Sequence, residues 1–313
     1  MINWLKRLVA LAALTLAAAC GGGDDERPNI VELASANPDL SILVEAAVAA
    51  DLASTLSGTD PLTVFAPTNA AFAALLTELG ITKETLLADK ALLTTVLTYH
   101  VVAARVLKAD IPLGKAVKPL LSNAFFKIDA VGTDILITDG RNRSSGIVAT
   151  DRLASNGVVH VIDKVILPAD KNLVEIAIAS APEFSILVEA LVAADLATAL
   201  SQPGPFTVFA PTNAAFAALL TELGITKEAL LADQALLTSV LSYHVAAGRV
   251  LKADIAVGTP VTTLQGQTFT IDSALDINDQ RGRKAAFVAT DVLTSNGVIH
   301  VIDKVILPSD PGS

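Results

Sequence analysis

Histidine and tyrosine are the residue types of this chain best suited to chemistry. The chain has four histidines, and both of its tyrosines directly precede one of them, as the pairs Tyr99-His100 and Tyr243-His244. Imidazole can act as a general acid or base near neutral pH, or it can ligate a metal. A metal site would need His100 and His160 to converge in space, and no cysteine or paired carboxylate stands near them to complete a ligand set.

The sequence also lacks the motifs that activate a nucleophile or bind phosphates. It contains no G-x-S-x-G elbow, no H-E-x-x-H helix, no Walker loop and no G-x-G-x-x-G turn. We therefore expect no enzymatic activity, no metal and no cofactor. We expect each histidine to be a partly buried side chain that is hydrogen-bonded to backbone at the junction of helix and sheet.

The Tyr-His pairs belong to a stretch of sequence that occurs twice. The string TVFAPTNAAFAALLTELGITKE occupies residues 63–84 and returns unchanged at 207–228. The closing string SNGVVHVIDKVILP begins at residue 155 and returns with one substitution at residue 295. The first landmarks recur at an offset of 144 and the closing one at 140, so the second copy lost about four residues from a surface loop. The chain contains a module and its copy.

The TVFAPTNAAF block, the Tyr-His pair and the NGVVHVIDKV block, in that order, resemble the motifs of the fasciclin-type domain. The resemblance covers residues 29–168, here module one, and residues 172–308, here module two, with residues 169–171 between them. It implies an α/β (α+β) fold of two tandem domains, each a helical layer packed on a β-wedge. Such domains usually stand on extracellular or cell-surface proteins, where they serve adhesion or matrix association, and the resemblance implies no enzymatic activity.

The same resemblance implies two sets of binding residues. In animal members the Tyr-His neighbourhood is tied to receptor binding, which points to Tyr99, His100, Tyr243 and His244 here, although a structural role is the better interpretation. A second adhesive feature of the family is an acidic residue followed by an apolar one, just ahead of the last motif. Asp291-Val292 matches this feature in module two, whereas Asp151-Arg152 departs from it in module one.

The first residues predict export and a lipid anchor. Residues 1–19 place Lys6 and Arg7 ahead of an apolar stretch that ends in small residues, as a secretory signal peptide does. Cys20 is the only cysteine and follows at once, so it resembles the lipidated cysteine of bacterial lipoproteins; an ordinary secreted protein is the alternative. Residues 20–28 then form a charged tether, and we expect the protein in the bacterial cell envelope, in the outer membrane or periplasm, or secreted.

Charge narrows the class of partner. Removal of residues 1–19 leaves 20 basic against 32 acidic side chains, a net charge of −12, so nucleic acid is not an expected partner. The two copies differ most over residues 106–149 and 250–289, and both carry an arginine-rich hairpin there. These hairpins are candidate contacts for an anionic polysaccharide or a surface protein, although a solvated turn is the simpler interpretation; their arginines are Arg141, Arg143, Arg281 and Arg283.

Periodicity predicts helices first and strands later in each module. In module one we expect helices over 30–36, 41–56, 70–79 and 91–99, with a buried strand over 62–66. Strands follow over 125–130, 134–138, 147–150 and 158–167. The function that these features favour is a lipid-anchored adhesion or matrix-interaction protein. Two alternatives remain, a carrier of a carotenoid or lipid in an apolar cleft and, last, an unrecognised hydrolase.

Overall fold

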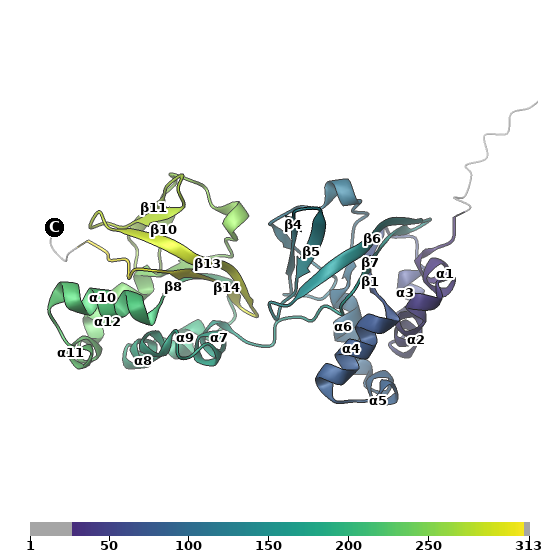
Figure 1. The fold of residues 1–313 in the computed structure, drawn as a ribbon, viewed down its shortest axis with the longest axis horizontal. Coiled ribbons are helices and arrows are strands. Elements are labelled where there is room, and N and C mark those ends of the chain that lie inside the picture. The colour runs from purple at the N-terminus through teal and green to yellow at the C-terminus, as the bar shows by residue number, and fades with distance from the viewer. Residues whose placement is uncertain (1–26, 310–313) are drawn as a thin grey trace, which may run out of the picture.

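The computed structural model describes residues 27–309. It confirms the expected fold: two modules of the same design, each with helices gathered on one side of a seven-stranded sheet (Figure 1). The predicted signal peptide, Cys20 and most of the tether lie outside the described residues. Within residues 27–309, no helix is both long enough and apolar enough to cross a bilayer.

The helices of module one begin and end at residues whose side chains or backbone suit those positions. Asn29 caps the first helix in a capping box, Thr68 caps the fourth, and Gly80 ends the fourth in the left-handed conformation at φ 65°. The predicted helix over 41–56 is two helices, because Asp51 adopts a φ of 57° and interrupts it. The helices are α1 (Ile30–Ser35), α2 (Ser41–Ala49), α3 (Ala53–Leu56), α4 (Asn69–Leu79), α5 (Lys83–Ala88) and α6 (Lys90–Tyr99), with short 3-10 turns η1 (Pro38–Leu40) and η2 (Lys108–Asp110).

The sheet of module one has the order β2-β1-β7-β6-β5-β4-β3, and β1 and β7 pair in parallel at its centre. All residues of β1 and β7 are buried, which explains why the sequences of these two strands are mostly apolar. The strands are β1 (Leu62–Pro67), β2 (Val101–Val102), β3 (Ala116–Val117), β4 (Phe126–Val131), β5 (Asp134–Thr138), β6 (Ser144–Ala154) and β7 (Gly157–Ile162).

Two predicted strands have different limits in the structure. The predicted strand over 147–150 is part of the longer β6, whose pairing with β7 shifts register between Ala149 and Arg152. The predicted strand over 158–167 ends at Ile162. Beyond that point Ile166 stays buried without being in a strand, because its N–H group is bonded to a histidine ring.

The turn between β6 and β7 fixes the closing motif against the first helix. The side chain of Asn156 accepts a hydrogen bond from Ile30 N (2.9 Å) and donates to the carbonyl oxygens of Leu56 (2.8 Å) and Gly58 (2.7 Å). The next residue, Gly157, has no room for a side chain, because a Cβ atom there would lie 2.1 Å from the Leu62 carbonyl oxygen. The packing of the closing motif against α1 and β1 therefore requires asparagine at position 156 and glycine at position 157.

Module two repeats this architecture with sheet order β10-β11-β12-β13-β14-β8-β9. Most of the length difference between the copies falls in one hairpin, because β11 and β12 are shorter than β4 and β5. The helices are α7 (Leu173–Ala179), α8 (Ser185–Ala193), α9 (Ala197–Leu200), α10 (Asn213–Leu223), α11 (Lys227–Ala232) and α12 (Gln234–Tyr243), with the 3-10 turn η3 (Lys252–Asp254). The strands are β8 (Phe206–Pro211), β9 (Val245–Ala247), β10 (Val261–Thr262), β11 (Thr268–Ile271), β12 (Asp276–Asn278), β13 (Lys284–Thr294) and β14 (Gly297–Ile302).

Candidate functional site

The Tyr-His pairs lie inside the modules. The hydroxyl of Tyr99 donates to the carbonyl oxygen of Phe125 (2.6 Å) and accepts from the N–H of Gly140 (2.9 Å), so it joins α6 to two segments of the sheet. Burial raises the pKa of Tyr99 well above its usual range. Tyr243 is buried in the same way and donates to the carbonyl oxygen of Thr268 (2.9 Å).

His100 links the end of α6 to the segment after β7. Its Nδ1 lies 2.7 Å from the carbonyl oxygen of Val96, and its Nε2 accepts from the N–H of Ile166 (3.1 Å), which fixes a neutral ring protonated at Nδ1. Burial lowers the pKa of His100 to about 4, and His244 has the same contacts and a pKa of about 4. The expectation that these histidines are buried and bonded to backbone is confirmed.

The other two histidines hold the aspartates that precede the closing motif. The N–H of Asp291 donates to Nδ1 of His300 (3.2 Å), whose Nε2 lies 2.8 Å from the carbonyl oxygen of Val250. His160 makes the corresponding contact with the N–H of Asp151 (3.3 Å). Both aspartates have a positive φ, 61° and 56°, so each histidine fixes an unusual backbone turn at the irregular part of its strand. Within residues 27–309, no group of three or more His, Cys, Asp or Glu side chains could hold a metal.

Two of the four hairpin arginines form ion pairs with a helix of their own module. Arg143 contacts Asp139 (2.8 Å) and Glu78 (2.8 Å), and its side chain is only 19% exposed. Arg283 contacts Glu222 (3.0 Å) at the corresponding place in module two. These guanidinium groups tie each hairpin to the helix beneath it. The Arg283 side chain is likewise mostly buried, at 16% exposed.

The other two hairpin arginines contact the segments that follow the modules. Arg141 Nε lies 3.2 Å from Asp170 Oδ2, so it fastens the short linker to module one. Arg281 Nε donates to the carbonyl oxygen of Pro308 (2.9 Å), at the end of module two. The geometry thus gives the hairpins a structural use, and their use in binding stays a prediction.

A buried ion pair joins the two modules. Lys127 on β4 contacts Asp291 on β13 at 2.8 Å, and the two side chains are 13% and 4% exposed. Asp291 also accepts from the N–H of Lys252 (2.7 Å), and Lys127 also contacts Asp129 (3.2 Å). Burial alone would lower the pKa of Lys127, but its hydrogen bonds to these two carboxylates and their negative charges raise it. Lys127 is therefore charged at neutral pH, although it is largely shielded from solvent.

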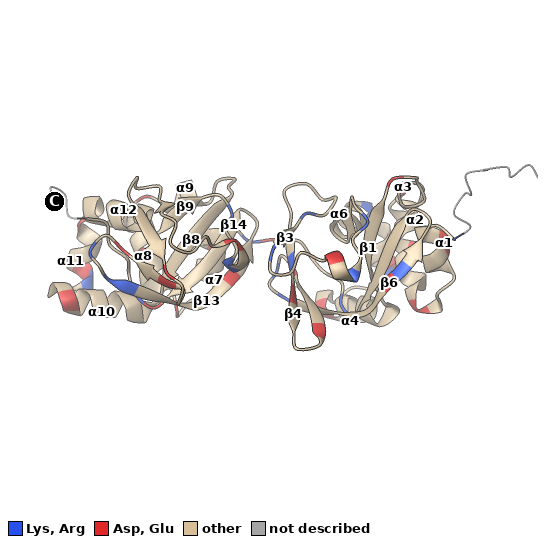
Figure 2. Cartoon of the chain, turned by 90° about the horizontal axis from the view of Figure 1, so that it is seen from above, with Lys and Arg blue, Asp and Glu red and all other residues tan. Residues whose placement is uncertain are grey.

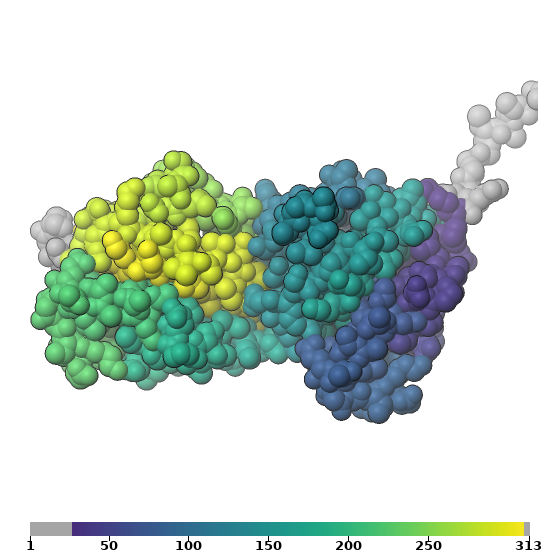
Figure 3. Space-filling model, in the orientation of Figure 1, coloured from purple at the N-terminus to yellow at the C-terminus, as the bar shows by residue number. Residues whose placement is uncertain are grey.

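An apolar cluster and an aromatic contact surround that ion pair. Phe125 of module one packs in one buried cluster with Leu251, Leu293 and Val298 of module two. The guanidinium carbon of Arg249 lies 3.6 Å from the centre of the Phe125 ring, a cation–π contact. The space-filling view shows the two modules in contact at their junction (Figure 3).

Asn142 completes the junction by acting as an extra strand residue. Its side-chain amide donates to the carbonyl oxygen of Leu293 (3.0 Å) and accepts from the Leu293 N–H (2.7 Å). Both polar groups of this β13 residue are satisfied by the neighbouring module, as they would be by a pairing strand. Contacts of three kinds therefore fix the modules against each other.

The residues that module one supplies to the junction are not repeated in module two. Tyr99 and Tyr243 bond to the carbonyls of Phe125 and Thr268, which shows that these two positions correspond. The stretches that differ between the two copies thus include the residues of the junction. This divergence is visible in the sequence, but only the structure shows that it marks a contact between the modules. The three corresponding pairs are Phe125 and Thr268, Lys127 and Thr270, and Asn142 and Gly282.

The contact between the modules buries the segment around Asp291 in module two, whereas the corresponding segment around Asp151 in module one is exposed to solvent. Leu293 is fully buried, whereas the corresponding Leu153 is 41% exposed. Asp291 is buried and Val292 half-buried, while Asp151 is exposed. Of the predicted adhesive pair, Asp291 therefore contacts module one, whereas Val292 packs against the core of module two.

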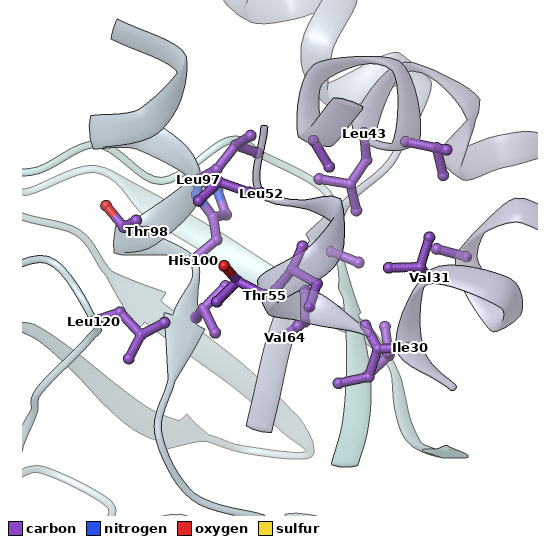
Figure 4. Close-up of a pocket in the computed structure, with 17 residues that line it drawn as sticks. Ile30, Val31, Leu43, Leu52, Thr55, Val64, Leu97, Thr98, His100 and Leu120 are labelled. Atoms are coloured by element: carbon purple, nitrogen blue, oxygen red, sulfur yellow. The ribbon is translucent and has the colours of Figure 1, made fainter. Parts of the chain in front are cut away.

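Each module has a small apolar cavity next to its Tyr-His pair. In module one the cavity is about 40 Å³ and lies among α1, α2, α6 and β1, with His100, Leu52 and Val64 in its wall (Figure 4). The cavity of module two is about 30 Å³ and includes His244. Pockets for drug-sized ligands are usually about 300–1,000 Å³. The cavities are thus far smaller than a carotenoid or lipid site requires.

The comparison with family models decides the classification. The model described as the fasciclin domain matches residues 38–168 and 182–308. The chain belongs to the fasciclin family. Both matched stretches contain the duplicated strings, the Tyr-His pair and the closing motif, so the resemblance drawn from those motifs is confirmed.

Similar proteins occur in animals and in bacteria. Transforming growth factor-beta-induced protein ig-h3 of Oryctolagus cuniculus is 33% identical over 254 residues, which are 81% of this chain and 35% of that protein. Protein sll1483 of Synechocystis is 43% identical over 152 residues, which are 47% of this chain and 79% of that protein. The chain therefore spans about a third of the length of ig-h3. A solved FAS1 domain pair from the insect cell adhesion molecule Fasciclin I is 20% identical, covers 88% of this chain and 95% of its own, and has a TM-score of 0.42.

Proposed function

We propose that this fasciclin protein is a non-enzymatic adhesion or matrix-interaction protein of the bacterial cell envelope, anchored by a lipid on Cys20. Family membership supports the adhesion or matrix role. The signal-peptide pattern of residues 1–19 and the cysteine that follows it support export and anchoring. The partner is a polysaccharide or a surface protein.

The observation that carries this proposal is the docking of the two modules. The ion pair between Lys127 and Asp291, together with the Asn142 contacts, orients module two on module one and so presents two modules as one unit. An adhesion protein benefits from such an arrangement, because surface contacts that are held at a fixed spacing can bind a repeating partner together. The duplicated Tyr-His pairs support only the non-enzymatic part of the proposal, because their polar atoms are used inside the fold.

A carrier function is the second candidate, and the structure gives it less support. The apolar cavities of about 40 Å³ and 30 Å³ have space for a few atoms of a ligand. A bound carotenoid would need both cavities to open widely. Purified protein that carries a visible absorbance band would favour the carrier function over adhesion.

Attachment of living cells tests the proposal. A strain that lacks the gene should attach less to extracellular matrix from its own biofilm, and the wild-type gene should restore attachment. A gene with Cys20→Ser should release the protein into the soluble fraction and should not restore attachment. Equal attachment by all these strains would contradict the proposed function, and Cys20→Ser protein that stays in the membrane pellet would contradict the anchor.

A further inference from the structure

A groove of about 590 Å³ with a mixed polar and apolar lining lies at the junction of the two modules. Module one contributes the loop 118–124, and module two contributes the loop 203–205, Arg249 and the β13–β14 turn. Basic positions lie on loops at this junction in the charge-coloured ribbon (Figure 2). Both walls must be in place for the groove to exist, so it depends on the docking contacts.

Arg249 brings an unpaired positive charge to this groove. One side of its guanidinium stacks on Phe125, and within residues 27–309 it makes no ion pair and its buried Nε has no hydrogen-bond partner. Burial lowers the pKa of Arg249, with no neighbouring carboxylate to offset the effect. Nε itself is covered, but the Arg249 side chain lines the groove without a carboxylate beside it, so the site favours an anion that comes from outside the chain.

The corresponding arginine of module one has partners that Arg249 lacks. Arg105 donates through Nη2 to the carbonyl oxygens of Ala154 (3.3 Å) and Ser155 (3.0 Å). Arg249 makes neither of these contacts in module two, because its guanidinium lies over Phe125. In the docked arrangement, Arg249 thus lies in the groove wall and makes no contact equivalent to the backbone hydrogen bonds of Arg105.

A second cation faces the groove from the other module. Lys118 is exposed, lines the groove, and forms no ion pair with any described side chain between residues 27 and 309. The whole chain is strongly acidic, with a formal net charge of −10. The two unpaired cations on opposite walls of the groove therefore make this part of the surface positive, although the protein as a whole is negative.

We propose that this groove binds an acidic polysaccharide, with Arg249 and Lys118 as the groups that receive its anions. A planar guanidinium suits a carboxylate or a sulfate, since it can donate two parallel hydrogen bonds, and a lysine ammonium adds a point charge to a neighbouring unit. Loops and turns line the groove, so it offers no open strand edge on which an acidic peptide could add a strand. The inference rests on the proposed function, because it names the partner of the adhesion protein.

Phe125 is a positioning residue for this site. Its ring holds the guanidinium of Arg249 at the groove wall, and it also packs in the cluster that fixes the modules. Phe125→Leu keeps an apolar side chain in the cluster but removes the cation–π contact. We expect this variant to retain the docked arrangement and to bind the polysaccharide more weakly.

The test is a calorimetric titration of residues 27–309 with oligogalacturonate, an acidic polysaccharide whose sugars carry carboxylates. We expect salt-sensitive binding by the wild type, roughly ten- to hundredfold weaker binding by Arg249→Gln, and a smaller loss for Lys118→Gln. Arg249→Lys should keep part of the affinity. Arg105→Gln is the matched control and should bind as the wild type does, and neutral dextran should not bind.

Sulfated dextran in a parallel titration shows whether carboxylate or sulfate is the preferred anion. Equal affinity of Arg249→Gln and wild type, or no binding of either acidic polysaccharide, would overturn the proposal. Tighter binding of polyglutamate than of both acidic polysaccharides would also overturn it, in favour of an acidic protein segment. Polysaccharide binding that Arg249→Gln weakens as expected, together with equal attachment of the wild-type strain and the strain that lacks the gene, would instead count against the proposed function alone.

Discussion

Removal of the lysine from the junction should destabilise the protein, because it leaves a carboxylate buried without its charge partner. In Lys127→Met the Asp291 carboxylate, 4% exposed, keeps only the Lys252 N–H as a close donor. Breaking a buried ion pair in this way typically costs about 3–5 kcal/mol, and the remaining backbone donor places our expectation near 3 kcal/mol. Asp291→Asn should cost less, because Lys127 keeps Asp129 at 3.2 Å.

A double-mutant cycle on urea unfolding measures this coupling. Lys127→Met combined with Asp291→Asn should cost less than the sum of the single variants by about 1–3 kcal/mol. Lys115→Ala is the control, because Lys115 approaches Asp254 of module two only at 3.9 Å and is largely exposed, so stability should hardly change. Small-angle scattering should show separated modules in Lys127→Met. Unchanged stability of Lys127→Met, or a coupling of zero, would refute the reasoning.

The remaining predictions concern groups inside the modules. The protein should lose stability as the pH falls from about 6.5 towards 4, because His100 and His244, with pKa values of about 4 in the fold, take up protons more readily when unfolded. The slope should reach about 1.4 kcal/mol per pH unit for each histidine, and thermal unfolding with no such slope would contradict the burial of these rings in the neutral form. Tyr99→Phe should cost about 1–3 kcal/mol by calorimetry, because it removes the hydroxyl that joins Phe125 to Gly140. An unchanged melting temperature would show that the hydroxyl contributes nothing.

The sequence predicted the fold well, because the duplicated strings carry local signals that the structure uses. Thr68 and Gly80 lie at the start and the end of the helix that their residue types predict, and the mostly apolar run over 62–66 forms the buried strand β1. The break at Asp51 was missed, because the apolar periodicity continues through it and only the backbone angle reveals it. The apolar residues after Ile162 were taken for strand, since burial without sheet pairing leaves the same sequence pattern.

The candidate site was less predictable, because it depends on contacts between distant segments. The burial of Arg143 could not be read from its loop alone, since one of the two carboxylates that pair with it, that of Glu78, lies 65 residues earlier. The fate of Asp291 likewise depends on Lys127, which is 164 residues away. Divergence between the copies did point to the right stretches, but only the docked arrangement shows that they form a junction and a groove.

Attachment of protein-coated beads to biofilm matrix tests most directly the claim that this fasciclin protein adheres as a docked pair. Beads that carry the wild-type chain should attach, and beads that carry Lys127→Met, whose modules separate, should attach several-fold less. Val192→Ser, on an exposed helix position of module two, should attach as the wild type does. Equal attachment of all three, or wild-type beads that attach no better than uncoated ones, would contradict the account.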